Sequence, residues 1–240
     1  MKPLIFLGSR MGMAQLATVA EDMGYQIEGI LDFQYHGNTD RISNIPVIGN
    51  DLWLMDKENT QAQEWLNGCD FFVADYFGGS KTEMRSWTLR KRRIQMLEEL
   101  GIDSPNLIHP SNNLAGLTSK YTDGSLKIGK GNFFDEDVVI HQDNVTIGDY
   151  CCLTWGSRVS HGSIVGNNVI FCPNTFYQFC NIGNDVFLGM NSKTKVYSID
   201  KKINIGNNAI IWAEACIKND IPNDSILTSK GRIVPVDLLY

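Results

Sequence analysis

The sequence lacks the marks of a secreted, metal-binding or membrane-bound protein. Its six cysteines form no CxxC pair and show no zinc-like spacing with histidine, so we expect neither a disulfide framework nor a metal site. No apolar run approaches the roughly 18 residues that a membrane span needs. The N-terminal "MKPLIFLGSRMG" has no small-residue cleavage site and is typical of a first strand rather than a signal peptide. We therefore expect a cytoplasmic protein with no membrane insertion.

Positive charge is also scarce. The chain has 21 lysines and arginines against 27 aspartates and glutamates, which gives a net charge of −6. Nucleic-acid binding requires a basic face, so a nucleic-acid partner is not expected. The one basic cluster, Arg90-Lys91-Arg92-Arg93, lies in a segment with helical spacing of its apolar residues, 80–101. We expect this cluster to be a solvated helix face rather than a phosphate-binding patch.

The first half of the chain alternates strand-like and helix-like segments. "PLIFLG", "YQIEGILDF" and "CDFFVADYF" have the composition of buried strands, and "MAQLATVAEDMG" has apolar residues at helical spacing. Strands that alternate with helices are typical of a parallel, doubly wound sheet. The pattern predicts an α/β, Rossmann-like domain over residues 1–108.

A candidate ligand site lies where the first predicted strand meets the first predicted helix. Gly8 and Gly12 flank this turn, and glycines there let a ligand approach backbone N–H groups that attract an anion. Asp32 ends the second predicted strand, where a carboxylate can bond a ribose or a base edge. "GSRMG" is not a complete GxGxxG fingerprint, so a tight structural turn remains the alternative.

The second half repeats with a period of six. Apolar residues recur every six positions in three runs: Ile128, Phe134 and Ile140; Ile147, Leu153, Val159, Val165, Phe171 and Tyr177; and Ile199, Ile205, Ile211 and Ile217. The register slips between Ile140 and Ile147 and between Tyr177 and Ile182. Glycine follows the aliphatic residue at Ile147, Val165, Ile182, Leu188 and Ile205. The period matches neither a strand nor a helix. It is the mark of a solenoid with three short faces per coil and one inward apolar residue per face.

The boundary between the two halves falls in a stretch rich in turn residues, "NLIHPSNNLAGLTSKYTDGS". The solenoid must be capped at its open end, and "NDIPNDSILTSKGRIVPV" is expected to close it. We therefore predict an all-β, parallel β-helix over residues 109–240.

Several of these segments resemble one group of enzymes. "IPVIGND" at 45–51, "LGIDSPNLIHPS" at 100–111 and "KNDIP" at 218–222 are similar to segments of the hexapeptide-repeat acyltransferases that carry an N-terminal nucleotide-binding domain. These are sugar N- and O-acetyltransferases of the sialic-acid and bacillosamine pathway type, with roles in lipopolysaccharide biosynthesis. The resemblance covers nearly the whole chain. It implies that the β-helix is left-handed and that the protein is a cytoplasmic homotrimer.

The resemblance also implies a reaction and its site. Acetyl-CoA would serve as co-substrate in a groove beside the β-helix, and a nucleotide-linked amino sugar would be N-acetylated. The resemblance places the nucleotide against Gly8, Ser9, Arg10, Asp32 and Phe33, and acetyl-CoA against Gly189, Met190 and Lys230. "VSHGSIVG" resembles the stretch that carries the family's general base, which makes His161 the candidate base.

The assignment of His161 leaves alternatives open. Ser160 and Gly162 stand where relatives have acidic residues beside the base. His141, about one coil earlier, is a second candidate. An imidazole suits proton acceptance near neutral pH, but positioning alone can also carry acetyl transfer if the amine starts neutral. Two other functions therefore remain as alternatives: sugar O-acetylation, and a non-catalytic scaffold that binds a nucleotide sugar.

Overall fold

The computed structural model describes residues 2–9, 12–35, 41–75, 81–112, 126–141, 144–195 and 200–239. The chain divides into two compact units, Met1–Leu107 and Ile108–Tyr240. None of the helices in these described ranges has the length and apolar character to cross a bilayer.

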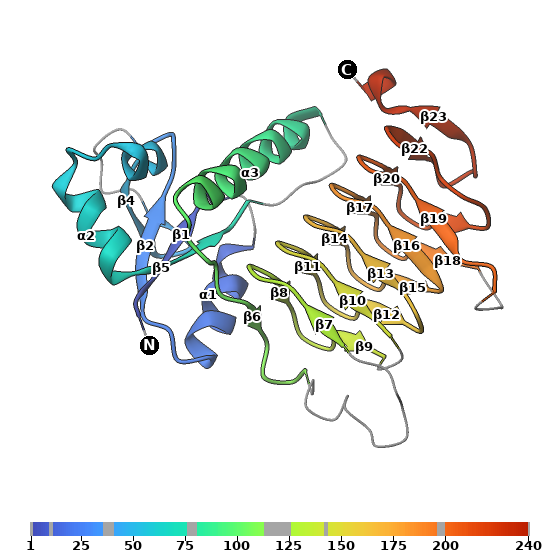
Figure 1. Ribbon diagram of the computed structural model, residues 1–240, viewed down its shortest axis with the longest axis horizontal. Helices are drawn as coiled ribbons and strands as arrows, with labels where there is room; N and C mark the ends of the chain where they lie inside the picture. The colour runs from blue at the N-terminus through green and yellow to red at the C-terminus, as the bar shows by residue number, and fades with distance from the viewer. Residues whose placement is uncertain are drawn as a thin grey trace. The chain divides into compact units, whose positions relative to one another are not determined.

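The first unit is a five-stranded sheet with helices (Figure 1). Its elements are β1 (Leu4–Leu7), α1 (Met13–Asp22), β2 (Ile27–Leu31), β3 (Arg41–Ile42), β4 (Ile45–Gly49), the 3-10 helix η1 (Asp51–Met55), α2 (Thr60–Gly68), β5 (Asp70–Val73) and α3 (Lys81–Glu99). The strand order is β3-β4-β2-β1-β5. β4, β2, β1 and β5 are parallel, and β3 is antiparallel to β4. All four residues of β1 are buried, as expected for the central apolar run "PLIFLG".

The prediction of a Rossmann-like, doubly wound domain is wrong. A Rossmann domain has two βαβαβ halves, with a helix in each crossover. Here the described residues hold only three α-helices, and none of them lies between β2 and β4. Instead, Ser43 and Asn44 have positive φ angles of 51° and 65° and form a two-residue hairpin that turns β3 back along β4. The unit is therefore a smaller, mixed α/β sheet.

The helix predicted over 80–101 is present as α3, but its basic cluster is not the solvated face that we expected. Arg90 and Arg93 are buried, with exposed fractions of 1% and 2%, while Arg92 is exposed. The two buried arginines are three residues apart and so share one helix face with Trp87 and Leu97, which are also buried. Their charges are compensated inside the unit.

The second unit is a β-helix built from three sheets of mainly parallel strands, and its arrangement is consistent with a left-handed β-helix (Figure 1). Its strands are β6 (Leu107–Ile108), β7 (Lys127–Ile128), β8 (Phe133–Phe134), β9 (Val139–Ile140), β10 (Thr146–Ile147), β11 (Cys152–Leu153), β12 (Arg158–Ser160), β13 (Ile164–Val165), β14 (Ile170–Phe171), β15 (Phe176–Gln178), β16 (Cys180–Ile182), β17 (Phe187–Leu188), β18 (Lys193–Thr194), β19 (Ile203–Ile205), β20 (Ile210–Ile211), β21 (Cys216–Ile217), β22 (Ser225–Leu227) and β23 (Ile233–Pro235), followed by η3 (Val236–Leu239). Each coil gives one short strand to each sheet.

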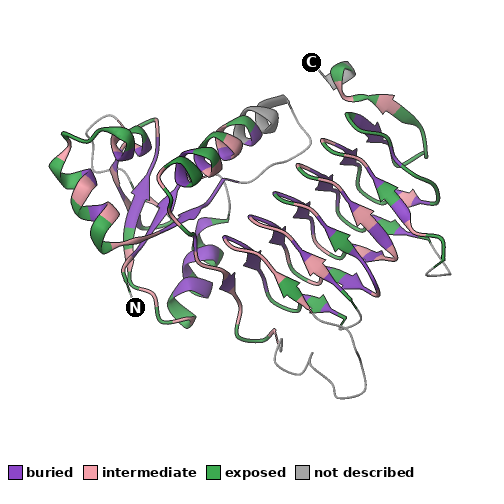
Figure 2. Cartoon of the chain, in the orientation of Figure 1, coloured by how far each residue is buried: buried purple, intermediate pink, exposed green. Residues whose placement is uncertain are grey.

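The period of six is the inward position of this β-helix. Val159, Phe171 and Tyr177 have no exposed surface and belong to one continuous core. Figure 2 shows buried stretches recurring along the strands of this unit. Ile199, one of the predicted repeat positions, lies outside the described residues. The predicted closing segment is also observed, because β23 pairs antiparallel with β22 and ends the parallel stack.

The glycines that follow the aliphatic residues mark corners where consecutive coils touch. A Cβ on Gly166 would lie 2.7 Å from the carbonyl oxygen of Gly183 in the next coil. Beside these glycines, asparagine side chains link one coil to the next. The Asn184 side-chain oxygen accepts from the Asn167 N–H of the preceding coil at 2.8 Å, and the Asn207 side-chain oxygen accepts from the Asn184 N–H at 2.7 Å. This corner has no space for a side chain at the glycine position.

Replacing Gly166 with alanine should therefore lower the free energy of unfolding by about 2 kcal/mol, as overpacking of a tight contact does. Gly68 at the end of α2 is the matched control, since a Cβ there meets nothing within 4 Å. Denaturant melts of the two variants should separate them, and equal midpoints would contradict the steric explanation.

Candidate active site

His161 lies at a corner of the β-helix, in a column of three rings. His141, His161 and Phe179 each follow a strand of the same sheet, after β9, β12 and β15. The ring centroids of His141 and His161 are 4.9 Å apart, and those of His161 and Phe179 are 5.6 Å apart with the planes at 19°. His141 is exposed, whereas His161 and Phe179 are half-buried. The imidazole of His161 is thus held between two flat rings.

The backbone at His161 is unusual. Its φ is 21° and that of Gly162 is 60°, so two successive residues lie in or near the left-handed region. Non-glycine residues reach this region at a cost of about 1 kcal/mol, which the surroundings must offset. The Phe179 N–H donates to the carbonyl of His161 at 3.1 Å, and the Ser163 hydroxyl donates to the carbonyl of Ser160 at 2.5 Å. This corner is fixed by contacts to its backbone on both sides of the histidine.

The nearby groups inside the β-helix are inert. Burial raises the pKa of the Cys180 thiol to about 12, and burial also raises the pKa of the Tyr177 hydroxyl far above its usual range. Neither can act as a nucleophile or a base near neutral pH. Of the three rings in the column, the two imidazoles carry a nitrogen that can accept a proton, and His161 is the more enclosed of the two.

The predicted nucleotide residues lie at the carboxyl ends of β1 and β2. Gly8 and Ser9 follow β1, Asp32 and Phe33 follow β2, and Arg10 lies outside the described residues. Asp32 is 5% exposed; its Oδ2 accepts from the Ser9 hydroxyl at 3.0 Å, and its Oδ1 accepts from the Gln34 N–H at 2.9 Å. The structure brings these residues together, and both oxygens of the Asp32 carboxylate accept hydrogen bonds from within the unit.

Sequence reasoning missed a charged cluster at the same edge of the sheet. Arg93 of α3 contacts Asp75, lies 2.6 Å (Nε) from Asp51 Oδ2, and lies 3.8 Å (Nη2) from Asp32 Oδ2. Burial raises the pKa of Asp75, against the opposing effect of Arg93. The feature of the sequence that could have indicated this cluster is the three-residue spacing of Arg90 and Arg93, which puts both on the buried face of α3.

A cavity of about 340 Å³ adjoins this cluster. It is lined by Phe33, Asp51, Leu52, Met55, Arg93 and Met96, among others. Among the predicted nucleotide residues that the structure describes, Phe33 alone lines the cavity, and the other described lining residues come from η1 and α3, which the sequence did not indicate. An apolar cavity with a few charged groups on one wall is a common form of ligand site.

The predicted acetyl-CoA residues fall on two separate turns. Gly189 and Met190 follow β17, and Lys230 lies in the turn between β22 and β23. β20 stands between β17 and β22 in the sheet, so the two turns are not adjacent. A Cβ on Gly189 would lie 2.5 Å from the Ala213 backbone nitrogen, so coil packing alone explains this glycine. Met190 is 50% exposed and Lys230 is exposed.

No protein-family model matches the chain. Among solved structures, a histidine-to-alanine mutant of GDP-perosamine N-acetyltransferase from Caulobacter crescentus, in complex with CoA and GDP-perosamine, is similar with a TM-score of 0.72 and 19% identity, over 97% of this chain and 96% of that one. WeeI from Acinetobacter baumannii gives a TM-score of 0.69 at 17% identity, over 97% and 99%. The acetyltransferase domain of PglB from Neisseria gonorrhoeae, in complex with acetyl coenzyme A, gives 0.61 at 18%, over 98% of both chains. The chain shares the fold of these proteins along nearly its whole length.

Curated relatives match a shorter stretch. Acyl-(acyl-carrier-protein)–UDP-N-acetylglucosamine O-acyltransferase from Pseudomonas savastanoi pv. phaseolicola is 28% identical in an alignment 126 residues long that covers 42% of this chain and 45% of that enzyme. The enzyme of the same name from Pseudomonas syringae pv. syringae is 28% identical in an alignment 123 residues long that covers 41% of this chain and 44% of that enzyme. The chain thus spans less than half the length of the curated relatives that it matches.

Proposed function

We propose that the chain is an acetyl-CoA-dependent N-acetyltransferase that acts on the amino group of a nucleotide-linked amino-deoxy sugar. The observation that carries the proposal is the imidazole of His161, held between the rings of His141 and Phe179 at a corner of the β-helix. The shared fold supports it, because the similar structures include acetyltransferases in complex with CoA or acetyl coenzyme A.

In this mechanism the sugar amine attacks the thioester carbonyl carbon of acetyl-CoA. The C–N bond forms, the C–S bond breaks, and the CoA sulfur leaves as a thiolate, which becomes the thiol when His161 passes on to it the proton taken from the amine. His161 accepts the proton that the amine loses, which is the role that suits an imidazole near neutral pH. Burial keeps Cys180 and Tyr177 protonated at that pH, so in this mechanism neither accepts the acetyl group, which passes directly from thioester to amine.

The N-terminal unit is proposed to hold the nucleotide. Ligands of open parallel sheets bind outside the carboxyl ends of the strands, and Gly8, Ser9, Asp32 and Phe33 all lie there. We include Arg10 of the same turn in this set. For acetyl-CoA, exposed Met190 offers apolar surface and Lys230 offers a charge for the phosphates, while Gly189 keeps the backbone of that turn close to its neighbour.

A second candidate, O-acylation of a sugar hydroxyl, is favoured by the curated relatives, which are O-acyltransferases. The experiment that separates the two is acetyl-CoA turnover, read as free thiol release, with nucleotide-linked amino sugars and their hydroxy analogues. The N-acetyltransferase predicts turnover with the amino sugar alone. The same sugar without its nucleotide should turn over poorly if the N-terminal unit binds the nucleotide. Nucleotide-sugar binding without any turnover would instead indicate the non-catalytic scaffold.

We also propose that the β-helix assembles into a homotrimer. Trp155 and Trp212 are 48% and 40% exposed, and large apolar side chains in such a position usually mark an interface. Phe176 and Phe179, half-buried within the chain itself, are the other two aromatic residues that we assign to this surface. Sedimentation at micromolar concentration should give three times the mass of one chain, and a stable monomer would contradict the proposal.

We also propose a cytoplasmic location, which the six free thiols fit.

A further inference from the structure

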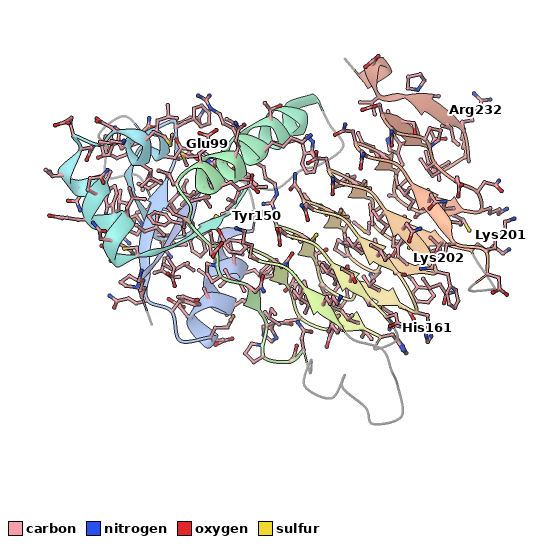
Figure 3. The ribbon with its side chains drawn as sticks, viewed as in Figure 1. Glu99, Tyr150, His161, Lys201, Lys202 and Arg232 are labelled. Atoms are coloured by element: carbon pink, nitrogen blue, oxygen red, sulfur yellow. The ribbon has the colours of Figure 1, made fainter. Side chains whose placement is uncertain are left out.

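A lysine from a later coil contacts the turn that carries His161. The Lys202 ammonium donates to the carbonyl oxygen of Gly162 at 2.7 Å, across 40 residues of sequence. Lys202 is half-buried and directly precedes β19, which pairs with β16 in the sheet next to this corner. Figure 3 shows His161 and Lys202 on the same side of the β-helix. The contact therefore ties two coils together beside the candidate base.

This contact acts on the part of the turn that most needs support. His161 and Gly162 have φ angles of 21° and 60°. The peptide group between Gly162 and Ser163 can rotate unless the Gly162 carbonyl is held. The carbonyls of Ser160 and His161 are held by neutral donors, the Ser163 hydroxyl and the Phe179 N–H. The carbonyl of Gly162 is held by a charged donor, and charge-assisted hydrogen bonds are about twice as strong as neutral ones.

We propose that Lys202 is a positioning residue for His161. By fixing the Gly162 carbonyl, it holds the strained turn in the one conformation that stacks the imidazole on Phe179 and aims it at the reacting amine. The inference rests on the proposed role of His161 as the base.

The test compares Lys202→Met, which keeps the length of the side chain but removes the donor, with Lys202→Arg, which keeps a charged donor. Exposed Lys201 gives the matched control, Lys201→Met. We expect Lys202→Met to lower kcat about tenfold or more, as misplacement of a catalytic group does, with KM for both substrates and the melting temperature little changed. Lys202→Arg should retain most of kcat, and Lys201→Met all of it.

A double-mutant cycle decides whether Lys202 acts through the histidine. In a His161→Asn background, Lys202→Met should cause no further loss, because the group that it positions is gone. The same fold-loss in both backgrounds would overturn the proposal in favour of a direct contact with substrate. A fall in melting temperature with a rise in both KM values would overturn it in favour of a purely structural role.

A readout without turnover keeps this inference separate from the proposed function. Stacking on Phe179 shifts the His161 ring-proton resonance, so Lys202→Met should move that resonance while Lys201→Met leaves it in place. If the wild-type chain transfers no acetyl group, the proposed function fails, and the resonance still tests the positioning. An unmoved resonance in Lys202→Met would overturn the positioning role whatever the activity.

Discussion

Replacing His161 with asparagine should lower acetyl transfer about a hundredfold or more, with little change in the affinity for either substrate. Asparagine keeps the approximate size and polarity of the side chain but cannot accept a proton near neutral pH. General-base catalysis contributes roughly a hundred- to ten-thousandfold, and a loss confined to kcat is the signature of a group that acts in the transition state. Steady-state kinetics with free-thiol detection measures both parameters.

His141→Asn is the matched control, because it alters the neighbouring ring of the same column. His141 is exposed, so its loss should cost only a few-fold in kcat. If His161→Asn also costs only a few-fold, positioning carries the reaction and the amine releases its proton to water. If His141→Asn has the larger effect, the roles of the two histidines are the reverse of those proposed.

The β-helix could be predicted from the sequence because every coil repeats the same pattern of apolar residues and glycines. Each face needs one inward apolar residue, and each tight corner needs a glycine, so the period of six appears directly in the chain. Val159, Phe171 and Tyr177 were placed inward by this argument alone, and they are fully buried. A closing segment at 219–236 was predicted because an open stack would leave apolar surface exposed, and β23 lies in it; the antiparallel pairing of β23 with β22 was not predicted.

The site around His161 was only partly accessible to such reasoning. The sequence places His141 and His161 about a coil apart, but it does not show the left-handed backbone of the turn at 161–162. It also does not show that a lysine 40 residues later reaches this turn. Both depend on the exact register between coils, which shifts where the repeat slips, between Tyr177 and Ile182.

The N-terminal unit shows the opposite case, in which local pattern was misleading. Alternating strands and helices suggested a doubly wound sheet, but the hairpin at Ser43 and Asn44 replaces a crossover helix. A run of four basic residues suggested a solvated face, although the helical period buries Arg90 and Arg93. Charge composition of a short segment does not reveal burial when the compensating carboxylates come from distant strands.

Replacing Arg93 with methionine should destabilise the N-terminal unit by about 3–5 kcal/mol at pH 7, the range found when one partner of a buried ion pair is removed. Asp51 and Asp75, 4% and 0% exposed, would then be left as buried carboxylates that have lost the guanidinium in contact with both of them. Arg92→Met is the matched control, since this neighbour on α3 is exposed and its loss should change stability by less than about 0.5 kcal/mol. The helical circular dichroism signal reports this unit, because the α-helices of the described chain all lie in it.

The deficit of Arg93→Met should shrink as the pH falls from neutral toward the ordinary pKa of a carboxyl group. Burial already raises the pKa of Asp75 in the folded chain, and Arg93 opposes that rise, so its removal raises this pKa further. Between the ordinary carboxyl pKa and this raised value, the folded state binds more protons than the unfolded state, and stability therefore decreases with increasing pH in that window. Chemical denaturation of both variants at several pH values measures the slope. A deficit that stays constant or grows as the pH falls over this range would show that the arginine stabilises this unit by packing and not by neutralising the aspartates.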